Sequence, residues 1–138
     1  MATRSLIGRQ NQDGSIDYIY CHWDGYPSNN GVILREHYTD PAKIDQLLDL
    51  GDLSSLAEEI GEKQDFDDRE SQNDNWCLAY GRDRGDKNVS ARRATSLNGF
   101  FSHATFVDYV YVFNKGKWKC YNAYSKDEIV IPKKELVD

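Results

Sequence analysis

The stretch from Ile19 to Gly31, "IYCHWDGYPSNNG", brings together several side chains that could do chemistry. A cysteine, a histidine and an aspartate stand at positions 21, 22 and 24, between large aromatic residues. A cysteine nucleophile needs a base within hydrogen-bond reach. Because neighbouring residues of a strand point to opposite faces, Cys21 and His22 are poorly placed to form that pair. We therefore expect Cys21 to be a core residue.

The spacing of the histidines and cysteines does not indicate a metal site. Histidines stand at positions 22, 37 and 103, with no H-x-H or H-x-x-x-H spacing. The three cysteines are widely separated and odd in number, which favours reduced, buried thiols over a disulfide framework or a zinc site. We expect no metal and no cofactor. Hydrolase or nuclease chemistry would require the three histidines to converge in one cleft.

The tetrapeptide from Asp24 to Pro27 ends the strand and has two interpretations. Turn chemistry explains it most simply, with Asp24 bonding backbone amides, Gly25 taking the strained φ and Pro27 leading into a helix. Alternatively, Trp23 and Tyr26 open onto a helix N-terminus, where free amides favour an anion. Aromatic faces beside an anion site suit a nucleotide.

The segment 76–93, "WCLAYGRDRGDKNVSARR", could supply the rest of such a site. The arginine fork matches a phosphate bidentately. Trp76 and Tyr80 share one face of the expected strand and could stack a base. In the alternative interpretation, Arg82 and Arg84 pair with neighbouring acids and form a solvated salt-bridge surface. Neither G-x-x-x-x-G-K-[ST] nor G-x-G-x-x-G is present, so the prediction of a phosphate site depends on the arginines.

Charge is distributed unevenly along the chain, whose formal net charge is -6. Between Glu58 and Asp74 stand eight acids and two bases, whereas Gly81 to Arg93 holds five bases and two acids. The negative net charge argues against general nucleic-acid or membrane-surface binding. No stretch has the length and hydrophobicity of a membrane span, and residues 1–8 lack a secretory signal, so we expect a cytoplasmic protein.

The periodicity predicts a single α+β domain of 138 residues. We expect an antiparallel β-sheet with two helices grouped on one side. The expected strands are 4–10, 16–23, 76–80, 105–113, 118–124 and 128–132, with turns at 11–15 and 114–117. The expected helices are 31–38 and 41–50, the second capped by Thr39 or Asp40 and closed by Gly51. We expect irregular structure at 51–61, a solvated loop at 62–75, a charged loop at 81–93 and a turn at 97–104.

The C-terminal third is rich in tyrosine, phenylalanine and tryptophan. Core packing and a self-association surface both explain such a set, because aromatic side chains bury large areas and are enriched at interfaces. We expect a homo-oligomer.

Several short blocks mark a family resemblance. "MATRSLIG", "IYCHWDGYP", "HYTD", "LGDLSSL" and "YGRDRG" resemble a set of small proteins encoded by phages and prophages, over nearly the full length. The chain is similar in size and plan to the anti-Thoeris sponges, counter-defence proteins that sequester a cyclic ADP-ribose-type immune signal without cleaving it. No ligand residues carry over from this resemblance.

These observations predict a non-enzymatic counter-defence protein in the host bacterial cytoplasm. It would sequester a phosphate-bearing, adenine-containing signal of cyclic ADP-ribose type. The expected ligand-binding residues are Trp23, Tyr26, Trp76 and Tyr80 for the base, Arg82, Arg84, Arg92 and Arg93 for the pyrophosphate, and Asp24 or Asn30 for ribose hydroxyls. The alternative is a protein-protein inhibitor of a host defence nuclease or complex, which would use the acidic segment Glu58 to Asp74 as its contact surface.

Overall fold

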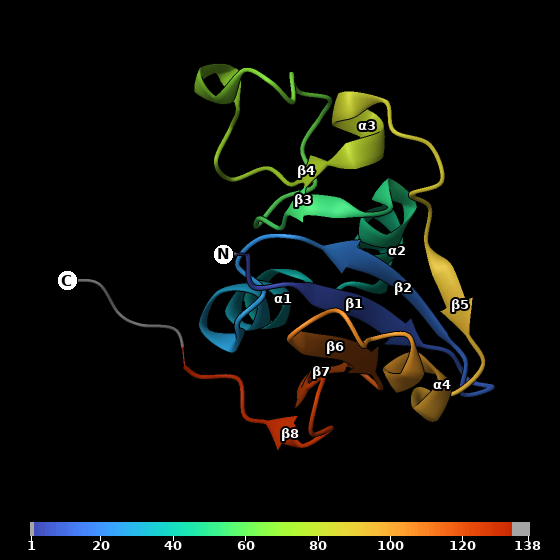
Figure 1. Ribbon diagram of the computed structural model, residues 1–138. Coiled ribbons are helices and arrows are strands. Elements are labelled where there is room, and N and C mark those ends of the chain that lie inside the picture. Colours follow the sequence, from blue (N-terminus) through green and yellow to red (C-terminus); the bar gives the residue numbers. More distant parts are fainter. Residues whose placement is uncertain (1, 134–138) are drawn as a thin grey trace.

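The computed structural model describes residues 2–133, and within this range eight strands form one mixed sheet (Figure 1). The strand order is β4-β3-β2-β1-β6-β7-β8, and β5 also pairs with β2. The strands are β1 (Ser5–Gln10), β2 (Ile16–Cys21), β3 (Leu53–Ser55), β4 (Leu78–Ala79), β5 (Arg92–Ala94), β6 (Tyr109–Asn114), β7 (Lys117–Asn122) and β8 (Glu128–Ile129). The helices are α1 (Val32–His37), α2 (Pro41–Leu50), α3 (Tyr80–Arg84) and α4 (Leu97–Ser102). Short helical turns η1 (Pro27–Gly31) and η2 (Arg69–Ser71) complete the elements, and the α+β prediction is confirmed.

Two hairpins form where the turn residues predict them. β1 pairs antiparallel with β2 across a turn in which Gly14 has φ 89. β6 pairs antiparallel with β7, and both Lys115 and Gly116 have positive φ at the turn between them. Positive φ at two central residues gives a turn whose twist matches that of the flanking strands.

Two strand pairs are parallel, in a sheet that is otherwise antiparallel. β1 pairs with β6, and β2 pairs with β3 through Cys21 and Leu53. Each parallel pair needs a long crossover, and the β2 to β3 crossover contains α1 and α2. Turn signals predict only neighbouring hairpins, which is why the parallel pairs were not foreseen.

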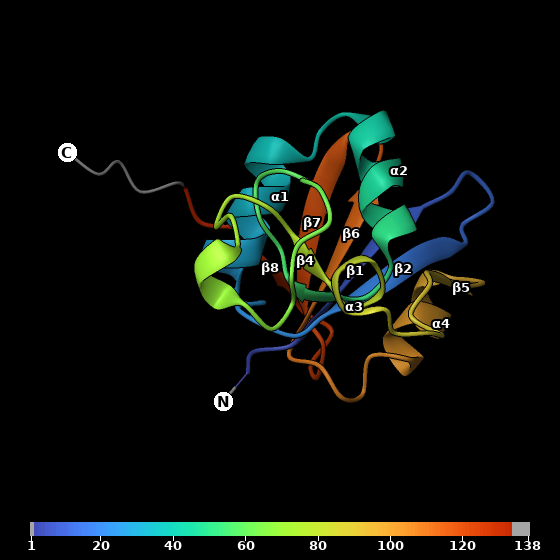
Figure 2. The ribbon, with the colours of Figure 1, turned by 90° about the horizontal axis from the view of Figure 1, so that it is seen from above.

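Helices cover both faces of the sheet (Figure 2). α1 and α2 pack on one face, where Leu34 and Leu47 meet Ile7 and Ile19 in one buried cluster. Their grouping on one side confirms the prediction for these two helices. The segment 97–104 was expected to be a turn, but it contains α4, which covers the opposite face. Ser96 caps α4 by accepting a hydrogen bond from the Gly99 amide at 3.0 Å.

α2 begins and ends at the predicted residues. The Asp40 side chain accepts a hydrogen bond from the Ala42 amide at 3.0 Å, with Pro41 in the first turn. Gly51 follows with φ 76, and a Cβ there would stand 2.2 Å from the Val89 carbonyl oxygen. The helix therefore stops at a position where only glycine fits.

The charged segment 81–93 is more structured than the predicted loop. Tyr80 begins α3 instead of ending a strand, so it does not share a strand face with Trp76. Arg92 and Arg93 stand on β5, which pairs with the first half of β2. Propensity alone does not favour strand at two adjacent arginines, and their carboxylate partners lie far away in the sequence.

The three cysteines are buried and unpaired, as predicted. Burial raises the pKa of the Cys21 thiol to about 12 and that of the Cys120 thiol to about 11. Neither is a thiolate at neutral pH. In the described part of the chain, none of the helices combines the length and apolar character needed to cross a membrane.

Candidate functional site

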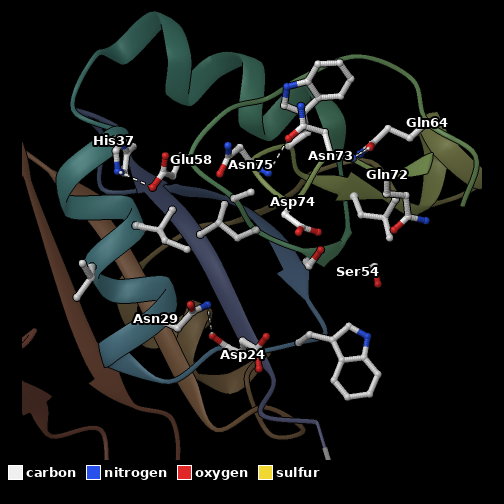
Figure 3. Close-up of a pocket in the computed structure, with 18 of the residues that line it drawn as sticks. Asp24, Asn29, His37, Ser54, Glu58, Gln64, Gln72, Asn73, Asp74 and Asn75 are labelled. Atoms are coloured by element: carbon white, nitrogen blue, oxygen red, sulfur yellow. Dashed lines mark hydrogen bonds and ion pairs between the residues drawn. The ribbon is translucent and has the colours of Figure 1, made fainter. Parts of the chain in front are cut away.

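A groove of about 710 Å³ lies among the end of β2, helix α1, strand β3 and the segment 60–75, here called the groove loop (Figure 3). Its two aromatic lining residues are Trp23 and Trp76. Most of its polar lining residues carry side-chain amides or hydroxyls: Asn29, Gln64, Gln72, Asn73, Asn75, Ser28, Ser54 and Ser55. The charged or titratable members are Asp24, Glu58, Asp74, Arg69 and His37, and aliphatic residues of α1 and the segment 56–57 form the floor.

The groove loop is closed at its neck by backbone pairing. Glu59 and Trp76 form a parallel bridge, in which the Glu59 amide donates to the Asn75 carbonyl and the Cys77 amide to the Glu59 carbonyl, both at 2.9 Å. Figure 3 shows Asp24 and Asn29 on one side of the groove and the loop amides on the other. The loop therefore forms one wall of the cavity.

Two glutamines hold the groove loop in shape from within. The Gln64 side chain accepts from the Asn73 amide at 2.7 Å and donates to the Cys77 carbonyl at 3.3 Å. The Gln72 side chain donates to the carbonyls of Asp65 and Phe66, at 2.9 and 3.0 Å. The sequence predicts a solvated loop anchored only by Phe66, but these amides tie its two arms together.

A buried ion pair holds the first part of the groove loop in place, which is called its foot below. The Asp83 side chain is fully buried and accepts from the Gln64 and Ala79 amides, each at 2.8 Å. Arg82 donates to Asp83 at 2.9 Å and also to the carbonyls of Ile60 and Cys77. The sequence predicts Arg82 as a phosphate ligand, but its guanidinium donates these hydrogen bonds to groups of its own chain.

Trp76 is positioned by the glycine on which it packs. Gly61 has φ +73, and a Cβ at this position would stand 2.3 Å from Cγ of the Trp76 indole. The backbone thus approaches the ring more closely than any other residue type allows. This contact sets the plane of one aromatic wall of the groove.

The strand end carries Trp23 and Asp24 into the opposite side of the groove. The Trp23 amide donates to the Ser54 carbonyl at 2.9 Å, and its side chain is 44% exposed. Asp24 itself has φ 55, so the aspartate and not Gly25 takes the strained conformation. Gly25 is required for another reason, because a Cβ there would stand 2.9 Å from the Thr3 carbonyl oxygen.

The groove contains an acid-base contact but no paired nucleophile. His37 Nε2 lies 3.5 Å from Glu58 Oε1. Among residues 2–133, no hydrogen bond joins His37 to one of the groove serines, although a serine nucleophile needs such a base. His103 lines a different cavity, and His22 hydrogen-bonds Tyr20. The three histidines therefore do not converge in one cleft.

The two β5 arginines are committed to carboxylates outside the groove. Arg92 donates to both oxygens of Asp52 at 2.9 Å, and Arg93 to both oxygens of Asp17 at 2.7 and 3.1 Å. The hydrogen bond from Arg93 lowers the pKa of Asp17, and the bond to Asp52 raises the pKa of Arg92. Neither arginine lines the groove, so within one chain they do not meet the tryptophans.

Arg84 and the partly buried Tyr80 form a separate cluster. Arg84 donates to both oxygens of Asp86, at 2.9 and 2.6 Å, which lowers the pKa of Asp86. Its guanidinium also lies over the rings of Tyr80 and Phe66, with centroid distances of 4.7 and 4.6 Å. The salt-bridge interpretation of this segment therefore describes its geometry, and Tyr80 does not line the groove.

Asn30 and Tyr26 also lie outside the groove lining. The buried Asn30 side chain donates to Ser5 Oγ at 3.3 Å and to Cys21 Sγ at 3.5 Å. The backbone amides of Asn29 and Asn30 donate to the Tyr26 carbonyl. The predicted anion site would have needed free amides at this position. Of the ten predicted ligand residues, Trp23, Asp24 and Trp76 share the groove.

The amide-bearing residues of the groove were missed because "ESQNDN" has the composition of an ordinary solvated loop. The usable signal was the density of Asn and Gln just before Trp76, since such side chains have both donors and acceptors.

Comparison of the chain with protein-family models, curated proteins and solved structures finds no match.

Proposed function

We propose that this protein captures a small, hydroxyl-rich molecule with a planar ring in the groove, and that it releases this molecule unchanged. The observation that carries the proposal is the joint presence of Trp23 and Trp76 with a wall of amides and hydroxyls in one cavity. An indole stacks on a flat ring, and amides bond hydroxyls in either direction. The volume of about 710 Å³ lies in the range of small-molecule sites.

The charge of the groove decides which part of a nucleotide it suits. Asp24, Glu58 and Asp74 provide three carboxylates, whereas Arg69 provides the one guanidinium. Such a surface repels a polyphosphate and accepts the hydroxyls of a ribose. The base and ribose of a nucleotide-derived ligand would lie in the groove, with its phosphates at Arg69 or in solvent. This arrangement replaces the four-arginine phosphate site expected from the sequence.

The resemblance to small phage proteins gives the proposal its specific form. The ligand would be an immune signal of cyclic ADP-ribose type, and the protein would act by sequestration in the host bacterial cytoplasm. None of the serines that line the groove is hydrogen-bonded to His37, the histidine of the groove, which supports binding without turnover there.

Calorimetric titration with adenosine, ADP-ribose and cyclic ADP-ribose tests this function. We expect at least one of them to bind, and we expect heat denaturation of the complex to return it intact by chromatography. Trp23→Ala should weaken binding about tenfold or more, because stacking contributes about 1–3 kcal/mol per base. Sedimentation of the same samples measures whether the protein is the predicted homo-oligomer.

Tyr124→Ala is the matched control, since Tyr124 is 97% exposed and does not line the groove. Its binding should equal that of the unsubstituted protein. Recovery of a cleaved product would identify an enzyme instead. Failure of all three compounds to bind, or an equal effect of the two substitutions, would overturn the proposal.

A second candidate function is inhibition of a host defence protein through the acidic segment. All eight acids of this segment are exposed: Glu58, Glu59, Glu62, Asp65, Asp67, Asp68, Glu70 and Asp74. In the described range, only Glu58 among them forms an ion pair. The remaining carboxylates are available to a basic partner surface.

Pull-down from host lysate distinguishes the two functions. A partner protein should be retained by Trp23→Ala and lost when Asp65, Asp67 and Asp68 are changed together to asparagine. The opposite pattern, or equal capture by both variants, would exclude the acidic segment as the contact surface.

A further inference from the structure

A second cavity lies on the face of the sheet that α4 covers, and its lining is mainly aromatic. It has a volume of about 340 Å³. Tyr18 and Tyr20 line it from alternate positions of β2, and His103 and Phe106 come from the segment after α4. Leu6 of β1 and the pair formed by Asp52 and Arg92 complete the lining.

The rings of this aromatic cavity are held in place by contacts with one another. Tyr18 stacks on His103 with centroids 6.1 Å apart, and Tyr20 lies 5.5 Å from Phe106. The Tyr20 hydroxyl is 2.7 Å from His22 Nδ1, which fixes the orientation of the Tyr20 ring. The cavity is therefore preformed, with ring surfaces already positioned for a ligand.

Phe106 supplies the exposed part of the wall. Its side chain is 54% exposed, an unusual placement for a phenylalanine in the segment that leads into a central strand. The local fold does not need this ring to be buried. A ligand in the cavity would remove part of its surface from water.

The two charges at the end of the cavity neutralise each other. Arg92 donates to both oxygens of Asp52 at 2.9 Å, and Asp52 Oδ1 also accepts from the Tyr20 amide at 3.0 Å. A carboxylate held in this way gives no net attraction to a cation, and its arginine gives none to an anion. Burial raises the pKa of Tyr18 and of Tyr20, so both hydroxyls stay protonated at neutral pH.

We propose that this aromatic cavity is a second binding site, which takes an uncharged planar ring of the size of a nucleobase or an indole. Its volume, at the lower end of the range for small-molecule sites, suits one ring system and not a whole dinucleotide. The ring lies against Tyr20 and Phe106. This site is separate from the groove, whose lining shares no residue with it.

The test uses Trp76→Ala protein, so that the groove is impaired while the aromatic cavity is intact; Trp23 is left in place because it packs on His22, which holds Tyr20. Adenine and indole are the neutral probes, choline the cationic probe and benzoate the anionic probe. In an NMR titration, adenine or indole should shift the amide signals of Tyr18 and Tyr20 with a Kd of about 1 mM or tighter, as a ring of this size reaches at ordinary ligand efficiency. Choline and benzoate should bind at least about tenfold more weakly, since no unpaired charge faces them.

Phe106→Ala, added to the same protein, should weaken the binding of adenine or indole about threefold or more, the effect expected for one lost aromatic contact. Tyr124→Ala is the control, because it removes an equally accessible ring that lies outside the cavity. Tighter binding of choline or benzoate, no saturable shift with either neutral ring, or equal effects of the Phe106 and Tyr124 substitutions would overturn the proposal. Loss of binding in the groove alone would leave these outcomes unchanged, so the two sites are tested independently.

Discussion

Gly61→Ala should destabilise the protein and move the indole of Trp76. Two effects add at this position: φ is +73, and the new Cβ would stand 2.3 Å from Trp76 Cγ. A side chain at positive φ costs about 1 kcal/mol, and forcing an added carbon into a packed contact costs about 1–3 kcal/mol. We therefore expect the free energy of unfolding to fall by about 2–4 kcal/mol.

Gly116→Ala separates the two effects, because Gly116 has φ +81 but nothing lies within 4 Å of an added Cβ. It should lose only the backbone part, about 1 kcal/mol. Urea unfolding of both variants measures the difference. The indole N–H signal of Trp76 in the NMR spectrum of the folded proteins reports on the ring, and it should shift only for Gly61→Ala. Equal unfolding free energies and identical spectra would show that Gly61 does not set the position of the ring.

The remaining predictions concern the carboxylates. Asp83→Asn should lower the unfolding free energy by about 3 kcal/mol, because it breaks an ion pair whose carboxylate is fully buried, and should make the groove loop sensitive to protease. Asp86→Asn, in an exposed pair, should change neither measurement appreciably. The pKa of Asp17 is lowered below its ordinary value of 3.8, mainly by the hydrogen bond from Arg93, so its contribution to stability is full above that value and is lost as pH falls through the depressed pKa. Asp17→Asn should thus flatten the acid side of the stability profile measured by thermal unfolding between about pH 5 and pH 2, and an unchanged slope would contradict this assignment.

Helix α2 and the two hairpins were predictable because their signals are local. Asp40 caps α2 within two residues of its own position, and Gly14 and Gly116 supply the positive φ that their turns require. Interactions of this range are written in the sequence as short patterns, and tertiary packing only reinforced them.

The roles of the arginines depended on partners far away in the sequence. Arg92 pairs with Asp52, 40 residues earlier, and Arg93 with Asp17, 76 residues earlier. A guanidinium that could hold a phosphate is, in sequence, the same as one that holds a carboxylate of its own chain. The pairing of β5 with β2 decided between the two.

The sequence by itself determined the α+β class, the buried and reduced cysteines, and the presence of Trp23, Asp24 and Trp76 near the ends of strands. Only the tertiary structure decided which of these residues meet. The groove exists because the Glu59 and Trp76 bridge closes the loop, and because buried Asp83 holds its foot through backbone amides. Backbone amides are present at almost every residue, so the contacts that close the loop have no residue signature from which to predict them.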